Sequence, residues 1–144
     1  MIYIDTSCLL KLFRDEPFSD AVLTEIGAQS QVIVSSLAEL ETLVQLKAAW
    51  AGGMIARSKW HRLEAELARL RNQPPFEFRT LPGTVFQTAL RQHRNAGDTH
   101  CRGLDRLHLA AMEELRVTRL MTHDEGQTRA AEAAGFQVVF PGRK

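Results

Sequence analysis

Two short apolar runs in this sequence each end at an aspartate. Ile2–Ile4 leads into Asp5, and Leu120–Thr122 leads through His123 into Asp124. In open parallel sheets, ligands bind beyond the carboxyl ends of the strands, so neighbouring strands here would turn two carboxylates toward one crevice. The alternative interpretation is that each aspartate only caps the helix that follows it. The matching positions of the two aspartates favour a shared site.

Glu41 and Asp105 are two further acids at positions that favour the same crevice. Glu41 lies one turn into a predicted helix, at the edge of an expected buried stripe of Leu37, Leu40, Val44 and Ala48. Asp105 opens another predicted helix, beside an expected buried stripe of Leu104, Leu107, Ala111 and Leu115. The alternatives are a solvated glutamate at the rim and an aspartate that only stabilises the helix dipole.

Four carboxylates at one edge of a sheet would repel one another and raise each other's pKa values. A hard divalent cation offsets this repulsion, and oxygen-only ligands favour Mg²⁺ or Mn²⁺ over zinc. Such a cation keeps coordination positions for water and phosphate, which suits hydrolysis of a phosphodiester. The sequence has no Gly-rich phosphate loop and no Gly-x-Ser-x-Gly nucleophile motif. The four acids therefore favour metal-assisted hydrolysis.

The composition narrows the class of protein. The 144 residues predict one domain over 1–144, with 44% hydrophobic and 24% charged residues, as in ordinary globular proteins. Eighteen basic against 17 acidic residues give a net charge of +1, so the total charge does not indicate a nucleic-acid binder. Cys8 and Cys101 lack zinc spacing, which predicts reduced thiols, and no apolar run has transmembrane length, which predicts a cytoplasmic protein.

Strand-like and helix-like segments alternate along the chain. Strands are expected at 2–4, 32–34, 76–81, 120–122 and 136–140. Helices are expected at 9–13, 18–28, 37–50, 54–72, 84–94, 104–115 and 127–134, with a polar loop at 95–103. This alternation predicts an α/β fold with a mainly parallel sheet.

Three blocks of the sequence resemble the PIN-domain family, and within it the VapC-like ribonuclease toxins of type II toxin–antitoxin modules. The blocks are MIYIDTSCLLKLFRDEP, VIVSSLAELETLVQL, and GLDRLHLAAM followed by RLMTHDEGQTRAAEAAGFQVVFPG. The resemblance implies a three-layer α/β/α sandwich with strand order 3-2-1-4-5, which would place the first and fourth strands side by side. It also implies Mg²⁺- or Mn²⁺-dependent RNA cleavage, a homodimer, and a cognate antitoxin that covers the site.

The resemblance assigns the family's four catalytic and metal-binding acids to Asp5, Glu41, Asp105 and Asp124. Thr6 and Thr122 match supporting hydroxyl residues, and Asp98 is an alternative for the third acid. Candidates for contact with RNA phosphate are Arg102, Arg106 and His108, although a histidine at this place in a helix is more often a packing residue.

The helical segment 54–73 is longer and more basic than the resemblance leads us to expect. Its basic residues are Arg57, Lys59, Arg62, Arg69 and Arg71. The segment is interpreted as an amphipathic helix with a solvated face, as an arm for a dimer or antitoxin, or as a surface that faces RNA.

Two other classes of function stay open beside the ribonuclease. A non-catalytic module that binds RNA or a protein would be expected to lose acids, and all four are present. A nuclease outside a toxin–antitoxin system, or one directed at DNA, is also compatible, because no motif here recognises a 2′-hydroxyl.

Overall fold

A five-stranded parallel sheet forms the middle layer of the computed structural model, which describes residues 1–144. The sheet has the order β3-β2-β1-β4-β5. Its strands are β1 (Ile2–Ile4), β2 (Val32–Ser35), β3 (Phe76–Arg79), β4 (Arg119–Met121) and β5 (Gln137–Val139). All neighbouring strands run parallel, and Tyr3 on β1 is in register with Ile33 on β2 and Leu120 on β4. The predicted strand order is confirmed, and β1 lies beside β4 as a shared crevice requires.

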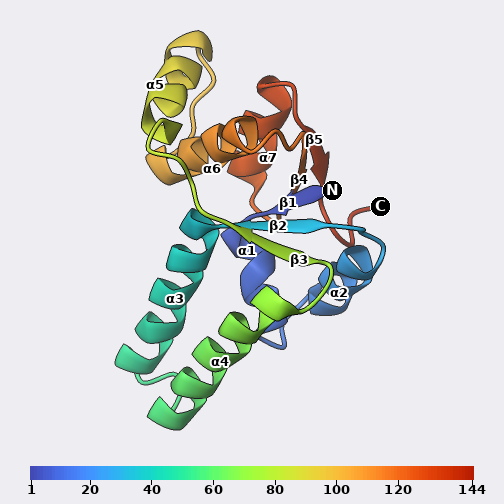
Figure 1. Cartoon of the computed structure of the whole chain (residues 1–144), viewed down its shortest axis with the longest axis vertical. Coiled ribbons are helices and arrows are strands. Elements are labelled where there is room, and N and C mark those ends of the chain that lie inside the picture. Colours follow the sequence, from blue (N-terminus) through green and yellow to red (C-terminus); the bar gives the residue numbers. More distant parts are fainter.

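Helices cover both faces of this sheet and complete the predicted α/β/α sandwich (Figure 1). One layer consists of α1 (Thr6–Leu9), α2 (Ser19–Gly27), α3 (Ser36–Ala51) and α4 (Arg57–Arg69), with single 3-10 turns at Leu10–Leu12 and Leu70–Asn72. The other layer consists of α5 (Val85–Asn95), α6 (Gly103–Glu114) and α7 (Glu125–Ala133). These bounds agree with the predicted ones to within about one helical turn. None of the helices has the length and apolar character needed to cross a bilayer.

The alternation of side chains along β1 divides the core into two layers. Ile2 and Ile4 pack with the α1–α4 side, whereas Tyr3 between them packs with α6 and α7 on the other side. Cys8 lies in the first of these layers, and both cysteines are free thiols, as predicted. β1 is therefore buried on both faces. The polar residues that follow it lie where the strand ends, at the carboxyl edge of the sheet.

The buried face of α3 differs from the predicted one. The residues that it buries are Ala38, Thr42 and Leu46. Leu40 and Val44, which were predicted to be in the core, are 59% and 56% exposed. The prediction was wrong because it selected the most apolar stripe of the helix, and that stripe points away from the sheet of this chain.

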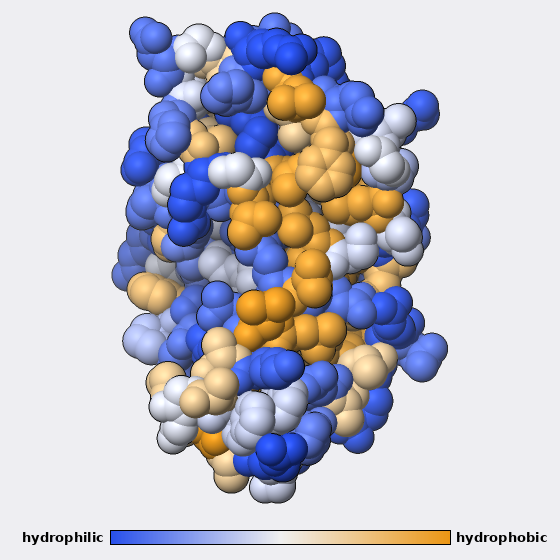
Figure 2. Space-filling model, turned by 90° about the vertical axis from the view of Figure 1, so that its left-hand side faces the viewer, coloured by the Kyte–Doolittle hydropathy of each residue, from blue (hydrophilic) through white to orange (hydrophobic).

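The prediction for α6 was wrong in the same way. Leu104 is 51% exposed, whereas His108, Leu109 and Met112 are buried. Together with exposed apolar residues of α3 and α5, Leu104 forms one surface that we call the apolar face (Figure 2). The members of the apolar face are Leu40, Val44, Phe86, Leu90 and Leu104.

Candidate active site

Asp5 is fixed at the carboxyl end of β1 by three hydrogen bonds. Its Oδ1 accepts from the Ser7 hydroxyl at 2.6 Å and from the Cys8 backbone N–H at 3.2 Å, which caps α1. Its Oδ2 accepts from the Thr122 hydroxyl at 2.5 Å. The side chain is buried, and desolvation raises the pKa of Asp5 although the nearby His108 and these hydrogen bonds act against it.

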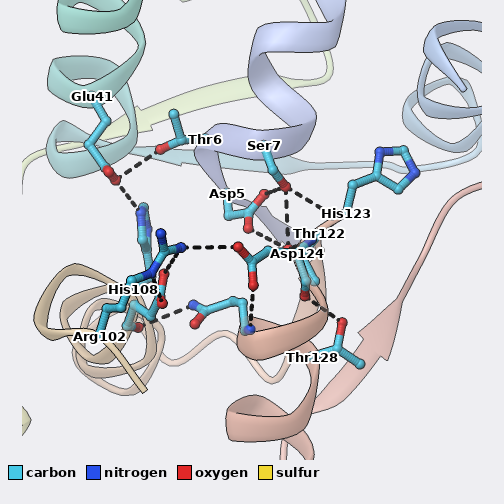
Figure 3. A network of polar contacts seen from close by, with 12 residues as sticks. Asp5, Thr6, Ser7, Glu41, Arg102, His108, Thr122, His123, Asp124 and Thr128 are labelled. Carbon is cyan, nitrogen blue, oxygen red and sulfur yellow. Dashed lines mark hydrogen bonds and ion pairs between the residues drawn. The ribbon is translucent and has the colours of Figure 1, made fainter. Parts of the chain in front are cut away.

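Thr122 joins the acid of β1 to the acid that follows β4. Its hydroxyl oxygen accepts from the backbone N–H of Asp124 at 3.0 Å while the hydroxyl donates to Asp5. Asp124 in turn caps α7, because its Oδ1 accepts from the Gln127 N–H at 2.8 Å. Both aspartates therefore cap the helices that follow them, and this capping holds both carboxylates at this edge (Figure 3).

Glu41 reaches the same edge from α3 with one oxygen fixed and the other without a protein partner. Its Oε1 accepts from the Thr6 hydroxyl at 2.9 Å and lies 2.5 Å from Nε2 of His108. Desolvation works to raise the pKa of Glu41, but the hydrogen bond from His108, the Thr6 hydroxyl and the charge of Arg102 outweigh it and lower that pKa. Glu41 is therefore held as a carboxylate, with Oε2 open to the crevice.

His108 connects Glu41 to a buried chain of hydroxyl groups. Its Nδ1 lies 2.7 Å from the Tyr3 hydroxyl, which lies 2.6 Å from Oγ of Ser35. Ser35 Oγ also accepts from the Ala38 N–H at 3.1 Å and so caps α3. With the proton on Nε2 of His108, every hydroxyl in the chain donates to the next group and the ring donates to Glu41.

Two of the three residues predicted to contact RNA are inside the protein. His108 is 3% exposed and Arg106 is 6% exposed, because both lie on the buried face of α6. His108 contacts Glu41 and Tyr3, and Arg106 lines a cavity of about 320 Å³ with residues of α5 and α7. Their burial disfavours contact with RNA phosphate at the surface, although Arg106 also lines a groove beside Glu41 and Asp105.

Arg102 bridges the two remaining acids. Its Nε donates to Oδ2 of Asp105 at 2.9 Å, and its Nη2 donates to Oδ2 of Asp124 at 3.0 Å. The Arg102 side chain is 73% exposed, whereas that of Asp105 is 13% exposed. Asp98 is exposed in the loop before α6 and makes no hydrogen bond or ion pair with these groups. The structure therefore brings Asp105, and not Asp98, to the other acids.

The four acids offer the ligand chemistry of a hard cation without forming a closed coordination sphere. No three His, Cys, Asp or Glu side chains of the chain converge into a ready metal-binding group. The donors at this edge are carboxylate oxygens, which Mg²⁺ and Mn²⁺ prefer, and Arg102 already places a positive charge on two of them. The residues present fit a divalent cation, and the exposure of Arg102 leaves its guanidinium free to turn away.

A groove of about 870 Å³ begins beside Glu41 and Asp105. Its outer wall includes Phe86, Leu90 and Leu104 of the apolar face. The groove therefore leads from the carboxylates onto a surface suited to an apolar partner.

Three hydroxyl residues of the site were missed by sequence reasoning. Ser7 contacts Asp5 and also accepts from the His123 N–H at 2.9 Å, while Tyr3 and Ser35 belong to the chain beneath Glu41. The place of Ser7 within IDTS gave a local signal. Tyr3 and His108 are 105 positions apart, so only the fold brings them together.

Known proteins resemble the chain over almost its whole length. The family model described as PIN domain matches residues 2–133. Ribonuclease VapC35 of Mycobacterium tuberculosis is 32% identical over 149 residues, which covers 99% of this chain and 98% of that protein.

Solved structures share its fold. VapC20 of Mycobacterium tuberculosis, a sarcin–ricin loop cleaving toxin, has a TM-score of 0.73 at 18% identity and covers 98% of this chain and 100% of that chain. VapBC2 of Rickettsia felis, bound to a DNA fragment from their promoter, has a TM-score of 0.71 at 11% identity and covers 96% of this chain and 98% of that chain.

Proposed function

The chain belongs to the PIN domain family, and on that premise we propose that it is a ribonuclease toxin of a toxin–antitoxin pair, acting on RNA in the cytoplasm. The observation that carries this proposal is that four acids, from the ends of β1 and β4 and from α3 and α6, lie around one edge of the sheet, where Thr6, Thr122 and Arg102 hydrogen-bond to them. The likeness to Ribonuclease VapC35 over nearly the whole chain supports RNA as the substrate. A non-catalytic binding module is disfavoured, because each acid is present and held by dedicated partners.

The proposed roles follow from how firmly each acid is held. Asp5, Glu41, Asp105 and Asp124 would hold one or two Mg²⁺ or Mn²⁺ ions. Such an ion, when bound, supplies positive charge beside the scissile phosphate and makes a water molecule more acidic. Asp5 has both oxygens fixed and gives the most rigid anchor, whereas Glu41 keeps Oε2 free to accept a proton from the attacking water.

Arg102 is the remaining candidate for contact with RNA. Its exposed guanidinium neutralises Asp105 and Asp124 in the structure. We propose that when a divalent cation takes over this role, Arg102 turns toward a phosphate next to the scissile bond, since guanidinium and phosphate form strong charge-assisted hydrogen bonds.

The first test is the dependence of RNA cleavage on a divalent cation. We expect cleavage of total bacterial RNA with Mg²⁺ or Mn²⁺ and its complete loss with excess EDTA. In the absence of RNA, millimolar Mn²⁺ should raise the melting temperature, because a ligand that binds only the folded state stabilises it by mass action. Cleavage that persists in EDTA, together with an unchanged melting temperature, would contradict the proposed site.

The second test concerns the antitoxin, which we place on the groove beside the carboxylates. Phe86 is 60% exposed on the apolar face, so Phe86→Asp should leave the fold intact. An interface contact of this kind is worth about 2 kcal/mol, and we expect inhibition by the protein encoded immediately upstream to weaken about 30-fold.

The matched control for this test is Leu23→Asp, which changes a residue of α2 that is 54% exposed and distant from the groove. Equal inhibition of the two variants, measured by titrating the upstream protein into a cleavage assay, would contradict the placement. The homodimer implied by the resemblance stays a prediction, which light scattering measures against the chain mass of 16.2 kDa.

A further inference from the structure

Helices α3 and α4 form a two-helix arm that extends away from the sheet (Figure 1). The two helices are joined by residues 52–56 and pack along each other through Leu63 and Leu67. The base of the arm carries Glu41 of the candidate active site, and its tip carries Trp50. Nine residues of helix separate these positions, or roughly 14 Å. The tip is therefore within reach of RNA that extends from the carboxylates.

The outer half of this arm, residues 42–63, carries a concentrated positive charge. It contains four Lys or Arg residues and no Asp or Glu, so the rest of the chain holds 14 basic against 17 acidic residues. All four basic side chains are exposed: Lys47, Arg57, Lys59 and Arg62. Only Arg62 has an ion pair, with Glu66 at 3.9 Å. The net charge of +1 thus combines a basic arm tip with an otherwise acidic molecule.

Aromatic rings stack among these charges. The rings of Trp50 and Trp60 lie 4.5 Å apart at an angle of 12°, and the His61 ring stacks on Trp60 at 4.5 Å. The Arg57 guanidinium lies 4.5 Å from the centre of the Trp50 ring. His61 is exposed, so one end of the stack is open to a further planar group. Aromatic rings and cations side by side are the elements with which proteins hold single-stranded RNA.

We infer that the outer half of the arm is an RNA-binding surface, which holds the strand that flanks the scissile bond. The four basic residues contact its phosphates, and the stack that ends at His61 receives a base. This inference rests on the proposed ribonuclease function and adds the surface that selects longer RNA over short fragments. The competing occupant of this surface is a protein antitoxin. An acidic segment of an antitoxin would be attracted by the same basic residues, so the test has to distinguish RNA from the antitoxin.

The test measures RNA binding in a chain that cannot cut. In an Asp5→Asn background, all four arm residues are changed together: Lys47→Gln, Arg57→Gln, Lys59→Gln and Arg62→Gln. The control removes the same charge from four exposed residues without ion pairs outside the arm: Arg94→Gln, Arg116→Gln, Arg129→Gln and Lys144→Gln. The probes are labelled single-stranded RNAs of about 16 and about 4 nucleotides.

We expect the arm variant to bind the longer RNA at least about tenfold more weakly, and the slope of log Kd against log salt to shrink by up to about 3. The control variant should keep both values, and the loss for the shorter RNA should be smaller. The double variant Lys47→Gln with Lys59→Gln, which leaves the stack untouched, should show about half of the change in slope.

Equal losses in the arm and control variants, or no loss in either, would overturn the inference. So would an arm variant that keeps RNA binding but no longer binds the upstream protein, since that result assigns the surface to the antitoxin. Because RNA binding is measured in a chain that does not cut, the RNA-binding inference and the ribonuclease proposal can be contradicted independently of each other. If no RNA is cut by the unaltered chain with any divalent cation, the ribonuclease proposal fails while arm-dependent binding still stands.

Discussion

Replacing Asp5 by asparagine should greatly slow RNA cleavage and stabilise the metal-free protein. The asparagine keeps an oxygen for the Ser7 and Cys8 hydrogen bonds, and its amide can donate to Thr122, so the cap of α1 is retained. The charge that would hold the cation is lost. Because metal-assisted hydrolysis depends on that charge at the scissile phosphate, we expect a fall in cleavage rate on the order of 10³-fold.

The stability of this variant should change in the opposite direction. Burial raises the pKa of Asp5, so the folded state binds this proton more tightly than the unfolded state. The contribution of Asp5 to stability is therefore greatest at low pH and falls as the pH rises through the folded-state pKa. Asparagine avoids that loss, and we expect a gain of about 1 kcal/mol, or roughly 3 °C, at pH 7.

Melting temperatures at pH 7 and near pH 4, together with a cleavage assay, check both parts of this prediction. The gain should be larger at pH 7, and Asp15→Asn, which changes an exposed aspartate, should alter neither stability nor cleavage appreciably. A variant that still cuts RNA, or that melts lower than the unaltered chain at pH 7, would contradict the role given to Asp5. Loss of cleavage together with higher stability is the signature of a residue kept for chemistry and not for folding.

The sheet and two of the four acids, Asp5 and Asp124, could be predicted from the sequence because they depend on local signals. Apolar triplets such as Ile2–Ile4 predict buried strands, and the polar residues after them predict helix caps. In a parallel sheet these caps fall at one edge, so Asp5 and Asp124 meet there by topology alone. The resemblance to PIN domains supplied Glu41 and Asp105, which local signals only suggested.

The faces of α3 and α6 could not be predicted, and the reason is physical. Periodicity identifies the most apolar stripe of a helix but not the surface that covers it. Leu40 and Leu104 belong to such stripes, yet they lie on the apolar face, while Thr42 and His108 are buried. The same error in two helices that border the groove is expected when the strongest apolar pattern serves a partner and not the chain's own core.

The wrongly predicted face of α6 matters most at His108, because this buried residue contacts Glu41. Substituting His108 by an amide residue separates its contact with Glu41 from its contact with Tyr3. The amide nitrogen of glutamine in His108→Gln reaches the position of Nε2, so it can still donate to Glu41 but loses Tyr3. The amide oxygen in His108→Asn reaches the position of Nδ1, so it keeps Tyr3 but leaves Glu41 without its donor. Both variants disturb the buried chain, and we expect each to lose about 2 kcal/mol of stability.

The two variants should differ in their rate of RNA cleavage although they lose similar amounts of stability. If His108 acts by positioning Glu41, His108→Asn should lower kcat by about 10–100-fold and weaken the stabilisation by Mn²⁺, as the loss of an outer-sphere partner does at metal sites. The kcat of His108→Gln should stay within about threefold of that of the unaltered chain. Equal losses in the two variants would show that His108 serves packing only. The expected order follows from one hydrogen bond: Glu41 Oε2 is held open to the crevice only while Oε1 is bound from below by His108 and Thr6.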